Sequence, residues 1–248
     1  MFYQLEITTR CNFSCFYCAG RDMPQKDMEW DAFTQIVDAI PGKRVTVSLQ
    51  GEGEPSLPPL FEDMARYVRD KGHRPYSILN GSRLDLAVLA GLFPTLGISV
   101  DTLDQCHAEE IGRHNLPKVL RQLDDLLRVM DARRVTVMTV DMGQPLDELR
   151  AWVRARGFGR HIIQPLSPKA DYAKRYTVST TGLQRSQSSF CPYLQRPHTR
   201  FFTWDGKQLP CCFMKDSSDF ETISQLRAEL LSAKFKRCCH GCPQLRPV

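Results

Sequence analysis

Ten cysteines are the residues of this 248-residue chain with the clearest potential for chemistry. Cys11, Cys15 and Cys18 form a CxxxCxxC run, Cys106 stands alone, and six more cysteines follow position 190. Glu6 lies where a secretion signal would be apolar, so we expect a protein that stays in the cytoplasm. In that compartment, clustered thiols bind metal or perform redox chemistry more often than they form disulfides. The sequence therefore predicts metal or redox centres at both cysteine clusters.

The CxxxCxxC run has the spacing of an iron-sulfur site with one open position. Three thiolates on one short loop can hold three corners of a cubane cluster and leave the fourth iron open to a substrate or cofactor. One alternative is a zinc site that takes His73 or His107 as its fourth ligand. Another is a chance grouping of buried thiols. The spacing favours the cluster and leaves both alternatives open.

The elements that position this loop alternate between strand and helix patterns, which predicts an α/β fold with a parallel sheet. Ligands bind at the carboxyl ends of the strands in such sheets, and the first cysteine run follows the first strand directly. The number of units predicts an open or partial (βα)6 barrel. The expected strands are 2–8, 44–49, 76–79, 96–100, 135–140 and 161–164, and the expected helices are 30–39, 60–71, 84–92, 116–130 and 146–155.

The composition of the chain changes after position 164. We expect the barrel domain over 1–166, a polar linker over 167–189 and a small C-terminal domain over 190–248. In the last domain, 200–204 and 207–209 flank an Asp205-Gly206 turn and predict a hairpin. A helix is expected over 223–235.

With the cysteine run in the loop after the first strand, the chain resembles the radical S-adenosylmethionine (SAM) superfamily over nearly its whole length. The resemblance implies a 4Fe-4S cluster whose open iron chelates SAM. It also implies that an electron from the cluster cleaves SAM to a 5′-deoxyadenosyl radical, which abstracts a substrate hydrogen. Tyr17 lies where the family places an aromatic residue beside the adenine.

Further family segments follow in order at the expected strand ends. Gly51-Glu-Gly-Glu-Pro55 is similar to a Gly-Gly-Glu-Pro segment that receives the SAM ammonium group, with Glu52 in place of the usual glycine. The resemblance therefore points to Gly53, Glu54 and Pro55. It also matches Asn80, which stands in an Asn-Gly turn. Ser99 and Asp101 match a segment near the ribose and methionine ends of SAM. Arg113 matches an arginine that pairs with the SAM carboxylate.

The second cysteine group resembles the auxiliary-cluster extension called SPASM, in its shorter form called twitch. Cys191, Cys211, Cys239 and Cys242 fit one auxiliary 4Fe-4S cluster best. The doublets Cys211-Cys212 and Cys238-Cys239 leave the ligand open at each position. A structural zinc site with four cysteine ligands is the alternative.

A fully ligated cluster can accept an electron, which would allow oxidation of an alcohol or amine. The resemblance to twitch-type dehydrogenases implies that the substrate is a small molecule of natural-product biosynthesis. The resemblance also implies an electron donor such as flavodoxin or ferredoxin. The rival hypothesis is modification of a ribosomally made precursor peptide, by cross-linking or by epimerisation with Cys106, Cys212 or Cys238 as hydrogen donor. The chain starts directly with the first expected strand, which favours a small molecule over a peptide.

Composition and charge exclude other classes of protein. The chain has 33 basic and 28 acidic residues, which gives a net charge of +5, and the two kinds are interleaved along the sequence. We therefore expect no nucleic-acid partner. The longest apolar stretch, 86–93, is too short to cross a membrane. A non-enzymatic iron-sulfur or zinc protein is a further alternative, but the ordered matches from Gly53 to Arg113 argue against it. The sequence identifies neither the catalytic base nor the oligomeric state.

Overall fold

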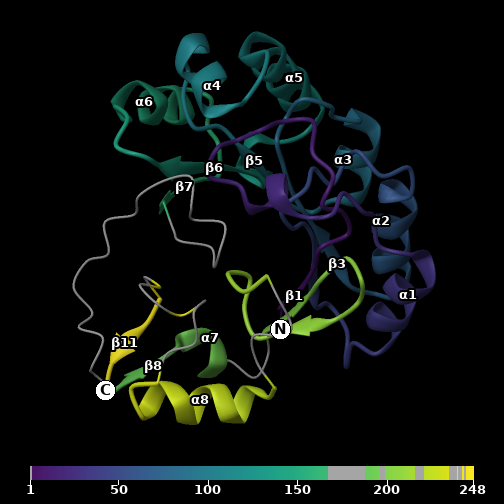
Figure 1. Cartoon of the computed structure of the whole chain (residues 1–248). Helices are drawn as coiled ribbons and strands as arrows, with labels where there is room; N and C mark the ends of the chain where they lie inside the picture. Colours follow the sequence, from purple (N-terminus) through teal and green to yellow (C-terminus); the bar gives the residue numbers. More distant parts are fainter. Residues whose placement is uncertain are drawn as a thin grey trace.

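The structure, a computed structural model, describes residues 2–166, 188–195, 199–215, 221–234, 239, 242 and 244–248. Most of the strands lie in two curved sheets. One sheet has the strand order β10-β9-β1-β2-β3, and the other has the order β4-β5-β6-β7. Figure 1 shows the arc that these strands form, with helices along its outer side. The strands are β1 (Phe2–Leu5), β2 (Thr46–Leu49), β3 (Arg74–Tyr76), β4 (Ile78–Leu79), β5 (Leu96–Ser99), β6 (Val135–Asp141), β7 (Arg160–Pro165), β9 (Thr199–Phe202) and β10 (Gln208–Leu209).

Neighbouring strands from β1 to β7 pair in parallel within each sheet, so the expected α/β fold of partial-barrel type is confirmed. The expected strand over 76–79 is wrong in one respect, because the chain divides there into β3 and β4 in different sheets. Ser77 lies at the division. Its hydroxyl donates to the Leu49 carbonyl at 2.6 Å, and its own carbonyl accepts from Gly97 N–H at 2.8 Å. Ser77 thus joins the two sheets.

Helices cover the outer face of the arc. They are α1 (Trp30–Asp38), α2 (Phe61–Asp70), α3 (Leu86–Leu92), α4 (Gln105–Ile111), α5 (Leu116–Val129) and α6 (Asp147–Ala155). Side-chain oxygens of Asp85, Asp104 and Asn115 cap the first turns of α3, α4 and α5, which stabilises each helix start. The sequence reasoning missed α4, whose mostly polar residues give only two buried positions, Ala108 and Ile111. Each described helix is too short or too polar to cross a membrane.

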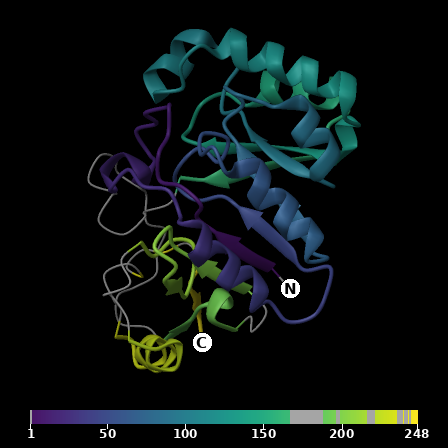
Figure 2. The ribbon, with the colours of Figure 1, turned by 90° about the vertical axis from the view of Figure 1, so that its right-hand side faces the viewer.

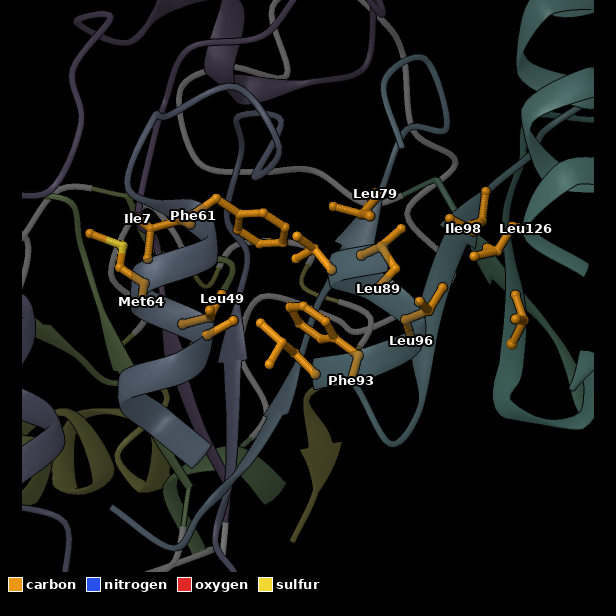
Figure 3. Close-up of a cluster of buried hydrophobic side chains, with 14 of the residues drawn as sticks. Ile7, Leu49, Phe61, Met64, Leu79, Leu89, Phe93, Leu96, Ile98 and Leu126 are labelled. Carbon is orange, nitrogen blue, oxygen red and sulfur yellow. The ribbon is translucent and has the colours of Figure 1, made fainter. Parts of the chain in front are cut away.

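The main core lies between the sheets and this helix layer. Figure 3 shows side chains from α2, α3 and the strands meeting there, with Phe61 and Phe93 among them. These two rings stack with centroids 5.5 Å apart. Leu49 and Ile98 are fully buried beside them. Because the helices bury their apolar faces on this side, the opposite face of the strands is left to line the interior of the barrel.

The C-terminal part completes the first sheet. The expected hairpin is confirmed as β9 and β10, which pair antiparallel, and β9 also pairs in parallel with β1. Its other elements are β8 (Ser189–Phe190), α7 (Pro192–Gln195), α8 (Ile223–Leu231) and β11 (Arg246–Pro247). Figures 1 and 2 both show α8 on the side of the molecule away from α4 and α5. The expected helix over 223–235 ends early, at Leu231. Most of the expected linker, 167–187, lies outside the described residues, so the domain division stays a prediction.

Candidate active site

A central cavity of about 520 Å³ opens at the carboxyl ends of the strands. It is lined from two directions, by the strand-end loops of the barrel and by the C-terminal part. Nearly all of the predicted first-cluster and SAM residues line it: Cys11, Cys15, Cys18, Tyr17, Gly53, Glu54, Asn80, Ser99, Asp101 and Arg113. Pro55 is the exception, since it is buried in the turn behind Glu54. The structure therefore brings together residues that are spread over a hundred positions of sequence.

The loop that carries the first cysteines is held by backbone hydrogen bonds to the end of α4. Ser14 N–H donates to the Gly112 carbonyl at 2.9 Å, and Phe16 N–H donates to the Ile111 carbonyl at 3.0 Å. Gly112 has a φ of 93°, and a Cβ there would lie 2.4 Å from the Ser14 carbonyl oxygen. Only glycine allows this close approach. A short helix that the sequence reasoning missed therefore supports the cysteine loop.

The three thiols of the first loop lie at the wall of the central cavity. Burial raises the pKa of Cys11 to about 11 and also raises that of Cys15. Backbone N–H groups approach the sulfurs of Cys11 and Cys18 at 3.4 Å, as expected around cluster ligands. Within the described residues, no three His, Cys, Asp or Glu side chains converge on one ion-sized point. The zinc candidates His73 and His107 do not line the cavity.

Glu54 and Asn80 form the wall next to this loop. The Glu54 carboxylate is 2% exposed and accepts hydrogen bonds from Asn80 N–H at 2.6 Å and from the Ser56 hydroxyl at 2.6 Å. Burial raises the pKa of Glu54 above its usual value. A buried carboxyl of this kind gains from a positively charged ligand. The role of Glu54 as receiver of an ammonium group stays a prediction.

Tyr17, Asp101 and Arg113 form a buried hydrogen-bonded network on another wall. The Tyr17 hydroxyl donates to Asp101 Oδ2 at 2.6 Å, and Arg113 Nη2 donates to the Tyr17 oxygen at 2.8 Å. Burial opposes the charge of Arg113, but the Asp101 carboxylate outweighs it, so the pKa of Arg113 lies above its usual value. Burial likewise raises the pKa of Tyr17, which stays protonated and donates. Arg113 is thus a fixed cation that already has partners inside the protein.

Glu52 and Lys215 are cavity residues that the sequence reasoning missed as partners. Glu52 Oε1 lies 2.6 Å from Lys215 Nζ, and both side chains are about 5% exposed. Glu52 stood out in the sequence as a charge in place of glycine. Lys215 gave no signal, because a single lysine in a polar stretch is typical of an exposed surface.

A second, smaller cavity lies in the C-terminal part. All four predicted auxiliary ligands line it: Cys191, Cys211, Cys239 and Cys242. Burial, together with the neighbouring thiols, raises the pKa of Cys211 to about 12. The described cysteines are thiols rather than disulfides. The four sulfur donors thus line one small apolar cavity of about 20 Å³.

The two cavities share a wall and divide one cysteine doublet between them. Tyr193 and Phe213 line both cavities, with ring centroids 5.8 Å apart. Cys211 lines the second cavity and Cys212 the central one. Cys238 lies outside the described residues, whereas Cys239 lines the second cavity. Cys106 is exposed on α4 and lines neither cavity.

The chain is similar to several known proteins. The chain is 28% identical to the S-adenosylmethionine-dependent nucleotide dehydratase of Selenomonas ruminantium over 142 residues. This matched region covers 55% of this chain and 52% of that protein. The chain thus spans about half the length of the curated relative it matches.

Two solved structures share the fold. Streptococcus suis SuiB bound to precursor peptide SuiA matches with a TM-score of 0.66 and 12% identity, over 86% of this chain and 59% of that one. Native anSMEcpe with bound AdoMet and Cp18Cys peptide matches with a TM-score of 0.64 and 14% identity, over 93% of this chain and 79% of that one. At these identities the likeness concerns the fold. A model of the family described as "Radical SAM superfamily" matches residues 5–155, and with the cysteine loop and strand-end residues in place, the chain belongs to the radical SAM superfamily.

Proposed function

We propose that this radical SAM enzyme oxidises an alcohol or amine of a small molecule and passes one electron to an auxiliary cluster. In this proposal Cys11, Cys15 and Cys18 hold the SAM-binding cluster, and Cys191, Cys211, Cys239 and Cys242 hold the auxiliary one. The observation that carries it is the pair of thiol-lined cavities that share Tyr193 and Phe213 as a wall. Oxidation needs an electron acceptor close to the substrate, and a cluster in the second cavity would lie directly behind that wall.

Cys11, Cys15 and Cys18 would hold a 4Fe-4S cluster, and when bound it would supply the electron for the cleavage of SAM to methionine and a 5′-deoxyadenosyl radical. The chain's own residues bind and orient SAM and the substrate. Gly53 and Glu54 receive the ammonium group, and Arg113 uses N–H groups that remain beside its internal partners to receive the carboxylate. Tyr193, Phe201 and Phe213 form an aromatic cluster that also lines the central cavity, and in this proposal they enclose the substrate. A protein such as flavodoxin or ferredoxin supplies the electrons.

Epimerisation is a second candidate function, and one observation favours it. Cys212 lines the central cavity, where a thiol could return a hydrogen atom to a substrate radical. A peptide residue or a sugar carbon could be its substrate. Among the three thiols considered from the sequence, exposed Cys106 does not line the cavity, and Cys238 lies outside the described residues.

Iron and sulfide per chain, after anaerobic reconstitution, test the two-cluster proposal. We expect about eight irons in the native protein and about four when Cys11, Cys15 and Cys18 are all replaced by alanine. A fall from about four irons to none would leave the second cavity without a cluster and would overturn the electron-acceptor mechanism.

The product identifies the reaction. Incubation with SAM, a reductant and candidate amino or hydroxyl sugars should give a product that has lost two hydrogens, together with 5′-deoxyadenosine. Loss of water from the substrate instead would indicate a dehydration, the reaction for which the nucleotide dehydratase relatives are named. Uptake of solvent deuterium without a change in composition would favour epimerisation, and Cys212→Ala would abolish that uptake.

A further inference from the structure

The carboxylate of Glu52 connects the first cysteine loop to the C-terminal part. Its Oε1 atom lies 2.6 Å from Lys215 Nζ, and its Oε2 atom accepts a hydrogen bond from Ala19 N–H at 3.2 Å. The thiol of Cys18 lies 3.3 Å from the same Oε2 atom and 3.3 Å from the Glu52 carbonyl oxygen. One buried side chain therefore touches a cluster ligand on one side and a lysine on the other.

Two buried carboxylates act on Lys215. Glu6 is also buried, and its Oε1 atom accepts a hydrogen bond from Glu52 N–H at 2.9 Å. Burial opposes the charged form of Lys215, but Glu52 and then Glu6 outweigh it, so the pKa of Lys215 stays above its usual value. Removing the ammonium group would take one positive charge away from these carboxylates, and breaking a buried ion pair is costly in a protein interior.

Lys215 belongs to the segment that lies between the two cavities. Cys211 of this segment lines the second cavity, and Cys212 and Lys215 line the central one. The Lys215–Glu52 pair is thus an ionic contact between the segment that carries a candidate auxiliary ligand and the loop that carries Cys18. Gly20, in the same loop, packs so closely on the Glu52 backbone that a Cβ would lie 2.6 Å from its carbonyl oxygen. A change at Glu52 therefore acts directly on the cysteine loop.

We propose that Glu52 and Lys215 are positioning residues that together set the reduction potential of the cluster held by Cys18. The inference rests on the proposed function. A cluster gains negative charge when it is reduced, and local charge and burial are principal determinants of its potential. The Glu52 carboxylate beside the Cys18 sulfur opposes reduction, and the Lys215 ammonium offsets that effect. The pair keeps the cluster reducible while the C-terminal segment is docked.

Single and double variants test the pair, with the midpoint potential of the SAM-binding cluster as the readout. Titration monitored by electron paramagnetic resonance should shift the potential to more negative values in Lys215→Met and to more positive values in Glu52→Gln. The double variant should return close to the native potential, and Lys215→Arg should retain it. The control is Arg128→Met, which removes one partner of an exposed pair with Asp125 and should leave the potential unchanged.

Opposite shifts separate a charge effect from general disruption of the site, because a loosened loop would shift both single variants in the same direction. Equal shifts, or none, would overturn the inference while leaving the proposed function intact. A native chain that binds no cluster after reconstitution would overturn both. If Lys215→Met does not fold, Glu52→Gln and the double variant still decide the question, since the double variant leaves neither partner of the pair behind.

Discussion

Arg113 Nε donates a hydrogen bond of 2.5 Å to Asp101 Oδ2 on the wall of the central cavity, and the two side chains are 12% and 1% exposed. Asp101 has further partners, because its Oδ1 atom accepts from Val140 N–H at 2.8 Å and its Oδ2 atom accepts from the Tyr17 hydroxyl at 2.6 Å. One carboxylate therefore ties together the cysteine loop, the end of β5, the strand β6 and the loop before α5.

We expect Asp101→Asn to destabilise the protein and to weaken SAM binding. The substitution leaves the buried guanidinium of Arg113 without its counter-charge, and breaking a buried pair in this way costs about 3 kcal/mol or more. Urea unfolding measures the loss of stability, and calorimetry measures SAM affinity. The matched control is Asp125→Asn, which breaks an exposed pair with Arg128 and should change stability by about 0.5 kcal/mol at most. Equal effects of the two variants would contradict the role of Asp101.

Stability should depend on pH through Glu54. The raised pKa means that the folded protein holds a proton at pH values where the unfolded chain has released it. The free energy of unfolding contributed by this group therefore falls as pH rises from the usual glutamate range, near 4.5, through the raised value. Glu54→Gln cannot release a proton, so its stability should fall less than that of the native protein over this window. Denaturant unfolding at a series of pH values measures the difference.

SAM affinity should change with pH in the opposite direction. The ammonium group of SAM pairs with the ionised carboxylate, so binding should strengthen as pH rises through the raised pKa of Glu54. The Glu54→Gln variant should bind SAM more weakly above this window and should lose the pH dependence. Calorimetric titration of the reconstituted protein at each pH gives both profiles. A Glu54→Gln variant that kept the native pH profile would assign the dependence to another group.

The strand-end residues could be predicted from the sequence for a physical reason. Parallel strands bring their carboxyl ends to one edge, so Cys11, Glu54, Asn80 and Asp101, each shortly after a predicted strand, had to meet there. The Lys215–Glu52 pair could not be predicted, because its partners are 163 positions apart and no periodic pattern relates them. The pairing of β9 with β1 was missed for the same reason. A local hairpin pattern specifies the turn between β9 and β10 but not the neighbour on the other side of β9.

The structure separates the two cysteines of the Cys211-Cys212 doublet, and this separation gives a further prediction. Cys211 lines the second cavity and Cys212 the central one, so alanine at each position should affect different properties. We expect Cys211→Ala to lose most of the auxiliary cluster, about four irons per chain, and Cys212→Ala to retain the native iron content. Iron and sulfide analysis after anaerobic reconstitution measures both. Loss of iron in Cys212→Ala with retention in Cys211→Ala would reverse the assignment of the doublet.

Substitutions at two glycines, Gly53 and Gly91, allow effects on the site to be distinguished from effects on the fold. A Cβ on Gly53 would lie 2.6 Å from the carbonyl oxygens of Thr8 and Arg10, which lie within three positions of the first cysteine of the loop. Backbone atoms cannot yield as a flexible side chain can, so Gly53→Ala should displace the loop and lower both cluster content and SAM affinity. A Cβ on Gly91, in α3, meets nothing within 4 Å.

Gly91→Ala is therefore the matched control for Gly53→Ala. It should raise stability by about 0.5–1 kcal/mol, because alanine loses less backbone entropy in a helix than glycine does. Its iron content and SAM affinity should remain native, since the residues of α3 do not line the central cavity. Iron analysis and calorimetry on both variants make the comparison. A Gly53→Ala protein with native iron content and SAM affinity would show that the approach of this turn to the Thr8–Arg10 backbone has no part in holding the cysteine loop.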